Sequence, residues 1–160
     1  MNYHIDIQHA STAAIPVSDA IIAQWVECVL TDHMPAAELT IRLVNEEEIA
    51  HLNSTYRKKN KATNVLAFPA KIHKGVELEY PLLGDIIVCP TVLQQESINL
   101  STPETAHWAH IIIHGVLHLL GYDHIADKDA TIMQAEEIKL LAQLGFEDPY
   151  QDHAGECEIE

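Results

Sequence analysis

The sequence has few cysteines, few basic residues and no long apolar run. Its three cysteines, Cys28, Cys89 and Cys157, share no short spacing. An odd number without a CxxC pair argues against a disulfide framework and against a thiolate zinc site. No apolar stretch approaches the ~18 residues that a membrane-spanning helix needs, and the first residues lack the pattern of a secretory signal. We therefore expect a cytoplasmic protein with no membrane partner.

Positive charge is scarce, yet it is concentrated in one segment. Lysine and arginine number 9 against 24 acidic residues, and the net charge is −15. Six of the nine basic residues lie in residues 57–74, "RKKNKATNVLAFPAKIHK", which contains no acidic residue. Such a segment attracts a polyanion locally even on an acidic protein. Charge alone leaves a solvated loop equally open as an interpretation.

The pattern of apolar residues predicts a single domain of the α+β class. The chain has 160 residues, of which 48% are hydrophobic, a composition typical of a globular domain. We expect strands at residues 3–8, 38–44, 65–68 and 85–89, and helices at 18–32, 45–56, 91–99, 102–120 and 127–144. These elements do not alternate regularly as βαβ units, which favours α+β. The domain is placed at residues 1–150, and an acidic, flexible tail at 151–160.

Several side chains predict where the helices begin and end. Ser18 is a typical N-cap, and Asn45 with Glu48 three residues later is similar to a capping box. Thr102 is expected to cap the fourth helix because proline follows it at the first helical position. Gly121 suits the left-handed conformation that ends a helix.

Histidine is abundant in a segment that otherwise reads as a buried helix. Residues 107–124, "HWAHIIIHGVLHLLGYDH", contain five histidines. His114 and His118 lie one turn apart on one face, and Gly121 lets the chain turn so that His124 returns to them. Three neutral imidazole nitrogens with an open fourth position are typical of a catalytic zinc site. We therefore expect one Zn²⁺ per chain, held by His114, His118 and His124.

The spacing H-G-x-x-H-x-x-G-x-x-H is that of the metzincin zinc peptidases, with one difference. Those peptidases carry a glutamate after the first histidine as general base, and this chain has Gly115 there. Peptide hydrolysis would therefore lack its proton acceptor. Glycine inside a helix costs ~1 kcal/mol relative to alanine, and we interpret Gly115 as leaving room for a substrate beside the metal.

Other polar residues near the motif have supporting roles or none. His107 and His110 are expected to hydrogen-bond the ligands or to lie at the surface rather than to bind the metal. Glu137 lies on the apolar stripe of the last helix, so it either pairs with a buried histidine or lies at the rim of that stripe. Asp123 either orients a ligand histidine or is a solvated or capping aspartate.

The motifs together resemble those of the bacterial YbeY family of endoribonucleases and rRNA maturation factors. The resemblance covers residues 43–150: "HGVLHLLGYDH" is the family signature, and "LNSTYRKKNKATNVLAFP", "LLGDI" and "LGFEDPY" resemble its other motifs. The resemblance implies a zinc-bound α+β fold with a small mixed sheet, here of four strands, packed with helices. By position, His114, His118 and His124 match the family's metal ligands, and Arg57 matches its functional arginine.

The resemblance also implies an activity and partners. It implies a single-strand-specific, metal-dependent endoribonuclease that acts in ribosomal RNA 3′-end maturation and in ribosome quality control. The partners would be single-stranded RNA, chiefly rRNA, and the ribosome or its proteins, and no DNA is expected. Arg57 would grip the scissile phosphate as a catalytic residue, and Lys58, Lys59 and Lys61 would hold neighbouring phosphates.

Two alternative functions stay open, and one motif departs from the family pattern. The alternatives are a zinc hydrolase of a non-RNA substrate and a zinc-stabilised, non-catalytic ribosome-assembly factor. In the second motif, Asn60 and Asn64 stand where the family commonly has aspartate, Ala62 where it has proline and Ala67 where it has serine. These changes remove two carboxylates from the loop and leave Arg57 unchanged.

Overall fold

The computed structural model of the chain describes residues 2–70 and 81–150. In chain order the elements are β1 (Asn2–His9), α1 (Asp19–Thr31), β2 (Ala36–Leu43), α2 (Glu46–Arg57), β3 (Val65–Pro69), β4 (Leu82–Val88), α3 (Pro90–Asn99), α4 (Glu104–Leu119) and α5 (Asp127–Gln143). The strands form one sheet of four strands in the order β1-β2-β4-β3. The predicted α+β fold with a small mixed four-stranded sheet is therefore confirmed.

Three strands of the sheet run parallel, and the fourth runs against them. β1 pairs with β2 and β2 with β4 in parallel, whereas β3 pairs with β4 in antiparallel orientation. β3 therefore lies at one edge of the sheet. The side of β3 that faces away from β4 offers backbone groups that no strand in the described part of the chain uses.

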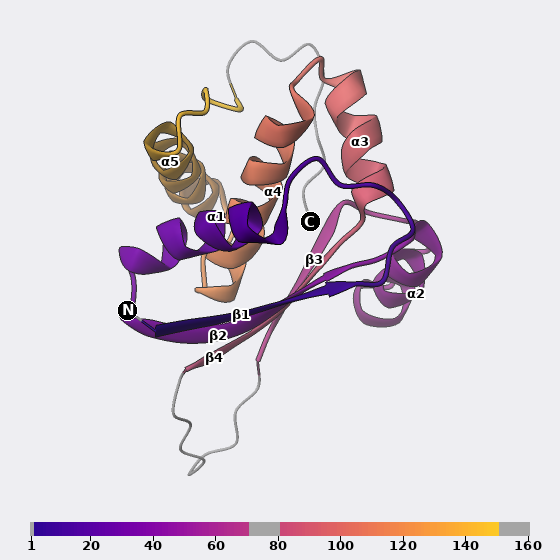
Figure 1. Cartoon of the computed structure of the whole chain (residues 1–160), viewed down its shortest axis with the longest axis horizontal. Coiled ribbons are helices and arrows are strands. Elements are labelled where there is room, and N and C mark those ends of the chain that lie inside the picture. Colours follow the sequence, from indigo (N-terminus) through magenta and orange to yellow (C-terminus); the bar gives the residue numbers. More distant parts are fainter. Residues whose placement is uncertain (1, 71–80, 151–160) are drawn as a thin grey trace.

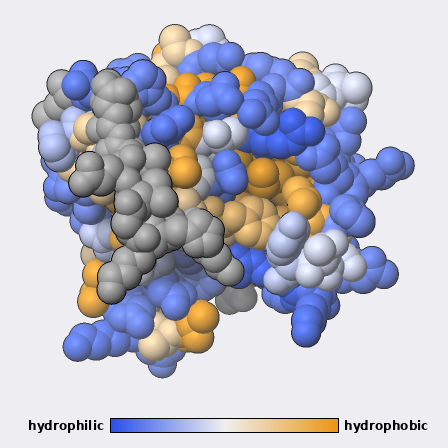
Figure 2. Space-filling view, turned by 90° about the horizontal axis from the view of Figure 1, so that it is seen from below, coloured by the Kyte–Doolittle hydropathy of each residue, from blue (hydrophilic) through white to orange (hydrophobic). Residues whose placement is uncertain are grey.

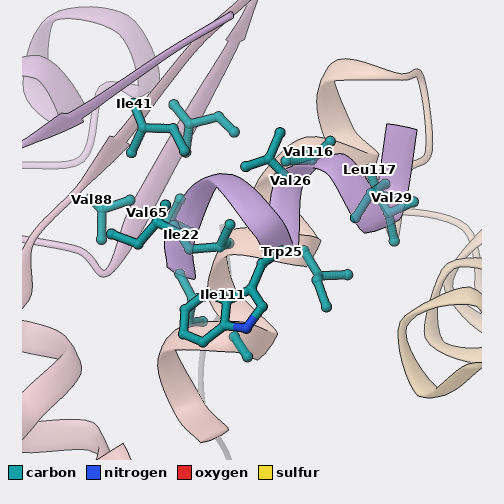
Figure 3. Close-up of a cluster of buried hydrophobic side chains, with 14 of the residues drawn as sticks. Ile22, Trp25, Val26, Val29, Ile41, Val65, Val88, Ile111, Val116 and Leu117 are labelled. Atoms are coloured by element: carbon teal, nitrogen blue, oxygen red, sulfur yellow. The ribbon is translucent and has the colours of Figure 1, made fainter. Parts of the chain in front are cut away.

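Helices cover both faces of the sheet, but unequally (Figure 1). α1 and α4 pack on one face, and α3 and α5 pack against α4. The core between these helices and the sheet includes Ile22, Trp25, Ile41, Val88 and Ile111 (Figure 3). On the other face of the sheet, α2 covers a smaller cluster of buried hydrophobic side chains. Seen from that side, the surface is mostly hydrophilic, with hydrophobic residues near its middle (Figure 2).

α4 is the central helix of the larger layer. Every residue from His107 to Leu117 is buried, because the sheet, α1, α3 and α5 all contact this helix. A helix that is buried on all sides is expected to be apolar all round. His107, His110 and His114 of α4 are therefore placed inside the protein, where each needs a hydrogen-bond partner or a metal ion.

Two of the predicted helix boundaries are confirmed in atomic detail. The hydroxyl of Ser18 accepts a hydrogen bond from the N–H of Ile21 at 3.4 Å and caps α1. Gly121 follows α4 with a φ of +103°. The N–H groups of Tyr122 and Gly121 donate to the carbonyls of Leu117 and His118, each at 3.0 Å, which is the Schellman arrangement expected of a glycine-terminated helix.

Two other predicted N-caps are wrong. Asn45 stands at the N-cap of α2 but makes no side-chain cap; its Oδ1 accepts instead from Ser11 Oγ at 2.9 Å and from Thr12 N at 3.1 Å. Glu48, the other half of the expected capping box, pairs with Arg42 at 2.7 Å. The N-cap of α4 is Pro103 rather than the preceding threonine.

The structure also bears on the cysteines, on membrane-spanning helices and on the basic segment. Cys28 and Cys89 are free thiols. Within residues 2–70 and 81–150, no helix combines the length and apolarity needed to cross a membrane. Cys157, the last two basic residues of the 57–74 segment and the tail at 151–160 lie outside the described residues.

Candidate metal centre

The three predicted ligand histidines converge at the C-terminal end of α4. His114 and His118 come from the helix, and His124 comes from the loop that leads to α5. One ring nitrogen of each lies within 4.8 Å of the others. His114 is buried, whereas His118 and His124 are partly exposed, so the group is open to the surface on one side.

The turn after α4 brings His124 back to the helix. Gly121 reverses the chain with its positive φ, and the carboxylate of Asp123 accepts from the N–H of His124 at 2.6 Å and of Ile125 at 3.2 Å. Of the two roles left open for Asp123, the capping role is therefore the one observed. The aspartate stabilises the backbone that carries His124 rather than orienting an imidazole.

Hydrogen bonds to the outer nitrogens determine which nitrogens face the centre. His114 Nδ1 donates to a carboxylate oxygen of Glu137 at 2.7 Å, and His118 Nδ1 donates to the carbonyl of Tyr122 at 3.0 Å. In neutral imidazoles this assigns the protons to Nδ1 and leaves lone pairs on Nε2. The two Nε2 atoms lie 3.0 Å apart, so their lone pairs repel each other unless a cation or a proton is shared between them.

His124 adds a third nitrogen with unmet bonding capacity. Its Nε2 atom is buried and has no hydrogen-bond partner among the described residues. A buried polar atom without a partner costs free energy, and a bound cation would remove that cost. Three converging imidazoles are a donor set that suits Zn²⁺, with a fourth position left for a further ligand. The residues present therefore fit the expected ion.

Glu137 pairs with the buried histidines and does not lie at a rim. Its side chain is fully buried on α5, and the oxygen bound to His114 also lies 3.3 Å from His110 Nε2. The hydroxyl of Tyr150 donates to the other oxygen and lies 3.2 Å from His110 Nε2. A carboxylate behind a metal-binding imidazole fixes the ring and increases its basicity. His110 thus supports Glu137 rather than hydrogen-bonding a ligand histidine directly.

The surroundings of the site keep His114 and His118 neutral and Glu137 charged. Burial lowers the pKa of His114. Burial and the neighbouring histidines lower the pKa of His118 to about 4. Burial alone would raise the pKa of Glu137, but hydrogen bonds from His110 and His114 lower it well below its ordinary value. At neutral pH the nitrogens of His114 and His118 are therefore free to bind a cation.

Tyr122 ties the ligand loop to α1. Its hydroxyl lies 3.1 Å from His33 Nε2, and the rings of the two residues meet edge to face with centroids 5.8 Å apart. His33 Nδ1 donates to the carbonyl of Val29 at 2.8 Å. The carbonyl of Tyr122 that orients His118 is thus held by a side chain from another layer. A lone histidine after α1 gives no signal of this role in the sequence.

His107 is part of a second polar network and does not support the metal ligands. It is buried, and its Nε2 lies 2.9 Å from Glu96 of α3. The amide of Asn64 donates to both carboxylate oxygens of Glu96, at 3.2 and 3.3 Å. His107 is not among the possible metal ligands in the described part of the chain, as expected, but it neither hydrogen-bonds them nor lies at the surface. It joins α4 to α3, and the amide of Asn64 supplies a donor to the Glu96 carboxylate.

Arg57 is anchored at the free edge of β3. It ends α2 and is exposed; its Nη2 donates to the carbonyl of Ala67 at 2.9 Å. Its guanidinium carbon lies 5.7 Å from the centroid of the Phe68 ring. Lys58 follows in the left-handed conformation, with a φ of 59°. This reverses the chain, and Lys58, Lys59 and Lys61 are all exposed.

Gly115 has a different role from the one expected. A Cβ atom built on it would lie 3.0 Å from Cγ2 of Ile86 on β4, so the glycine allows α4 to approach the sheet closely. The interpretation that Gly115 leaves room for a substrate beside the metal is therefore wrong. Ile86 pairs with Ala67 in the β3–β4 register. Ala67, whose carbonyl binds Arg57, therefore lies on the strand next to Ile86, and Ile86 is the residue that Gly115 of α4 approaches.

Comparison with known proteins places the chain in a family. A sequence model of the family described as endoribonuclease YbeY matches residues 6–145. An endoribonuclease YbeY of Legionella pneumophila strain Corby is 54% identical over 158 residues, which are 99% of this chain and 100% of that protein. One of Pseudomonas putida strain KT2440 is 49% identical over 148 residues, 92% of this chain and 93% of that protein.

A solved structure shares the fold. The solution structure of a Thermotoga maritima protein covers 91% of this chain and 99% of its own chain, with a TM-score of 0.56 and 21% identity. At that identity the likeness concerns the fold alone. The match of the family sequence model and the two bacterial relatives extend over nearly the whole chain, and they agree with the resemblance seen in its motifs. The chain therefore belongs to the endoribonuclease YbeY family.

Proposed function

We propose that this chain cleaves single-stranded RNA with the help of a zinc ion bound by His114, His118 and His124. Family membership makes it an endoribonuclease of rRNA processing, a hydrolase that acts on RNA. The zinc ion, the preference for single strands, the action at rRNA 3′ ends and the part in ribosome quality control are the proposal. The observation that carries it is the convergence of three imidazole nitrogens, one of them buried without a partner among the described residues.

The residues around the ion hold it and orient its ligands. When bound, a zinc ion supplies a Lewis acid that activates water and offsets negative charge on phosphoryl oxygens. Glu137 fixes the ring of His114 and places a negative charge behind it. The carbonyl of Tyr122 fixes the ring of His118 in the same way, but it carries no negative charge.

Arg57 is well suited to bind the scissile phosphate. One of its N–H groups is used by the carbonyl of Ala67, which holds the guanidinium in place and leaves its other donors for a ligand. A preorganised cation stabilises the charge that develops on phosphoryl oxygens. We propose that Lys58, Lys59 and Lys61 hold neighbouring phosphates without reading bases.

The setting of the reaction is also part of the proposal. We propose that residues 1–150 are the catalytic domain, and that the protein works in the cytoplasm with the ribosome or its proteins as partners. The strongly negative net charge repels nucleic acid over most of the surface. Binding is therefore expected only where the basic segment lies, and DNA is not an expected substrate.

The test is cleavage of a defined single-stranded oligoribonucleotide by wild type, His114→Ala and Arg57→Ala, with metal analysis and identification of the product ends. We expect zinc in the wild type, and a loss of kcat/KM of about 100-fold or more in each variant, as for other removed charge-stabilising groups. A chelator should abolish cleavage and zinc should restore it. Lys139→Ala, which removes a surface cation paired with Asp32 at 3.7 Å, should cleave normally.

Cleavage that survives in folded His114→Ala and Arg57→Ala would identify a contaminating nuclease. That result would favour the non-catalytic ribosome-assembly factor instead.

A further inference from the structure

Tyr56 presents an exposed aromatic ring beside the basic segment. It lies one residue before Arg57 at the end of α2, and 63% of its surface is exposed. A large aromatic ring at that exposure gains little from folding, because most of its apolar surface stays in water. Its position is therefore of interest for binding rather than for stability.

The ring of Tyr56 forms a pair with a second aromatic ring from β3. The Tyr56 and Phe68 centroids lie 5.2 Å apart, with ring planes at 65°. In such an edge contact the rings are not stacked on each other. The guanidinium of Arg57 lies over the same Phe68 ring. We call Tyr56, Arg57 and Phe68 the α2–β3 platform.

Positive charge continues from the platform along the chain. Residues 57–70 contain Arg57, Lys58, Lys59 and Lys61 and no acidic residue. Asn53 holds this loop against α2: its buried side-chain amide donates to the carbonyl of Lys61 at 3.0 Å, and its backbone carbonyl accepts from the N–H of Lys59 at 3.3 Å. The cations and the rings are thus held together at one end of one helix.

Aromatic rings next to cations are the combination that binds single-stranded nucleic acid. The cations follow the phosphates, and the rings stack on bases whatever their sequence. A base inside a duplex already has both faces stacked on its neighbours, so it has no face to offer to Tyr56. A surface of this kind therefore discriminates between unpaired and paired strands without reading bases.

We propose that the α2–β3 platform is a stacking site for an unpaired base of the RNA substrate, with the adjoining phosphates on the basic loop. The inference rests on the proposed function and adds a physical source for its preference for single strands. The charge complementarity of the loop on an otherwise acidic chain favours a polyanion over an apolar protein partner at this surface.

Substitutions of Tyr56 test the site, with both affinity and cleavage measured on a single-stranded oligoribonucleotide. Tyr56→Ala should raise KM and Kd by about 5- to 100-fold, the range of base–aromatic stacking, and leave kcat unchanged, because binding alone is affected. Tyr56→Phe should behave as wild type, and Tyr56→Leu should resemble Tyr56→Ala. Ile98→Ala, which removes a side chain of 64% exposure on α3, is the matched control and should change nothing.

A substrate series separates stacking from a general surface effect. In a set of oligoribonucleotides, one base is removed at a different position in each. The wild type should bind one member of the set less tightly than the intact strand. Tyr56→Ala should bind that member as tightly as it binds the intact strand. Affinity for a duplex should be the same in the wild type and the variant.

Two failures of the proposal are distinguishable. If the wild type cleaves single strands and folded Tyr56→Ala and Tyr56→Leu keep its KM, the stacking site is refuted and the proposed function stands. If the zinc-loaded wild type cleaves no RNA, the proposed function fails, and equal Kd values of the wild type and Tyr56→Ala would also refute the stacking site.

Discussion

At the scale of single residues, Glu137 shows how a buried charge is stabilised beside a candidate metal centre. It has no exposed surface, which would ordinarily make a carboxylate protonate. Donors from His114, His110 and Tyr150 surround it and keep it ionised. The charge in turn holds His114 in the tautomer whose Nε2 faces the other ligands.

Glu137→Gln is expected to weaken the metal site without removing a ligand. The amide keeps the size of the side chain but loses its negative charge, so the hydrogen bond to His114 becomes weaker. Zinc affinity, measured by competition with a chelator, should fall about 10- to 100-fold, as for other outer partners of metal ligands. Glu136→Gln, one residue earlier and 4.0 Å from His33, is the control. An unchanged zinc affinity in Glu137→Gln would contradict the role given to the carboxylate.

At the scale of elements, the packing of α4 on the sheet decides what its motif can do. In the motif HGVLHLLGYDH glycine follows the first histidine, and that position faces Ile86 of β4 rather than the histidines. A glutamate at this position would therefore not act as the base of a peptidase. The difference from the metzincin motif is a difference in helix–sheet packing as well as in chemistry.

Gly115→Glu is expected to unfold the protein rather than to create a peptidase. The new side chain would collide with Ile86 and bury a charge among apolar groups. The loss of stability should be about 3 kcal/mol or more, measured by denaturant unfolding with a peptide assay alongside. Gly115→Ala tests the size of the side chain without a charge. The better helix propensity of alanine offsets the 3.0 Å contact of its Cβ with Ile86, so the free energy of unfolding should change by less than about 1 kcal/mol. Folded, peptide-cleaving Gly115→Glu would overturn this account.

Helix boundaries show which local signals suffice. The cap at Ser18 and the stop at Gly121 depend only on neighbours within a turn, and both are as predicted. Asn45 follows the same local pattern, yet its side chain bonds to Ser11 and Thr12, more than thirty residues earlier. A side chain can give up a local hydrogen bond for one of similar strength to a residue far away in the sequence. A short window of sequence does not include that distant residue, so it cannot predict the outcome.

At the scale of the whole molecule, the candidate metal centre gathers residues from two helices and two loops. The candidate ligands come from α4 and the loop after it, Glu137 comes from α5, and His33 comes from the turn after α1. Metal binding and folding should therefore be linked, because the arrangement exists only when these layers are packed together.

The metal-free protein is expected to lose stability as the pH falls from about 6.5 to about 4. The pKa of His118 is about 4 in the folded chain, against an ordinary value near 6.5 in an unfolded chain. Between these values the unfolded chain binds a proton that the folded chain does not, so the free energy of unfolding decreases as the pH falls. His114, with its lowered pKa, acts in the same direction.

Thermal unfolding of the chelated protein across this pH range measures the effect. His118→Gln should reduce the dependence on pH, and an unchanged dependence in that variant would contradict the assignment. Saturating zinc at neutral pH should raise Tm, because the ion binds only the folded form tightly.

The sequence by itself determined the order and type of the elements, the spacing that brings three histidines together and the family. These depend on periodicity and on residues within a few turns of one another, such as His114, His118 and His124. The concentration of positive charge after α2 was likewise visible without a structure.

Only the tertiary structure decided the sheet order, the pairing of His114 with Glu137, the use of Asn45 and the closeness of Gly115 to Ile86. It also brought Tyr56 and Phe68 together beside Arg57. The physical reason is common to all of these: each is a contact between residues far apart in the chain, and its strength depends on burial and distance that packing creates.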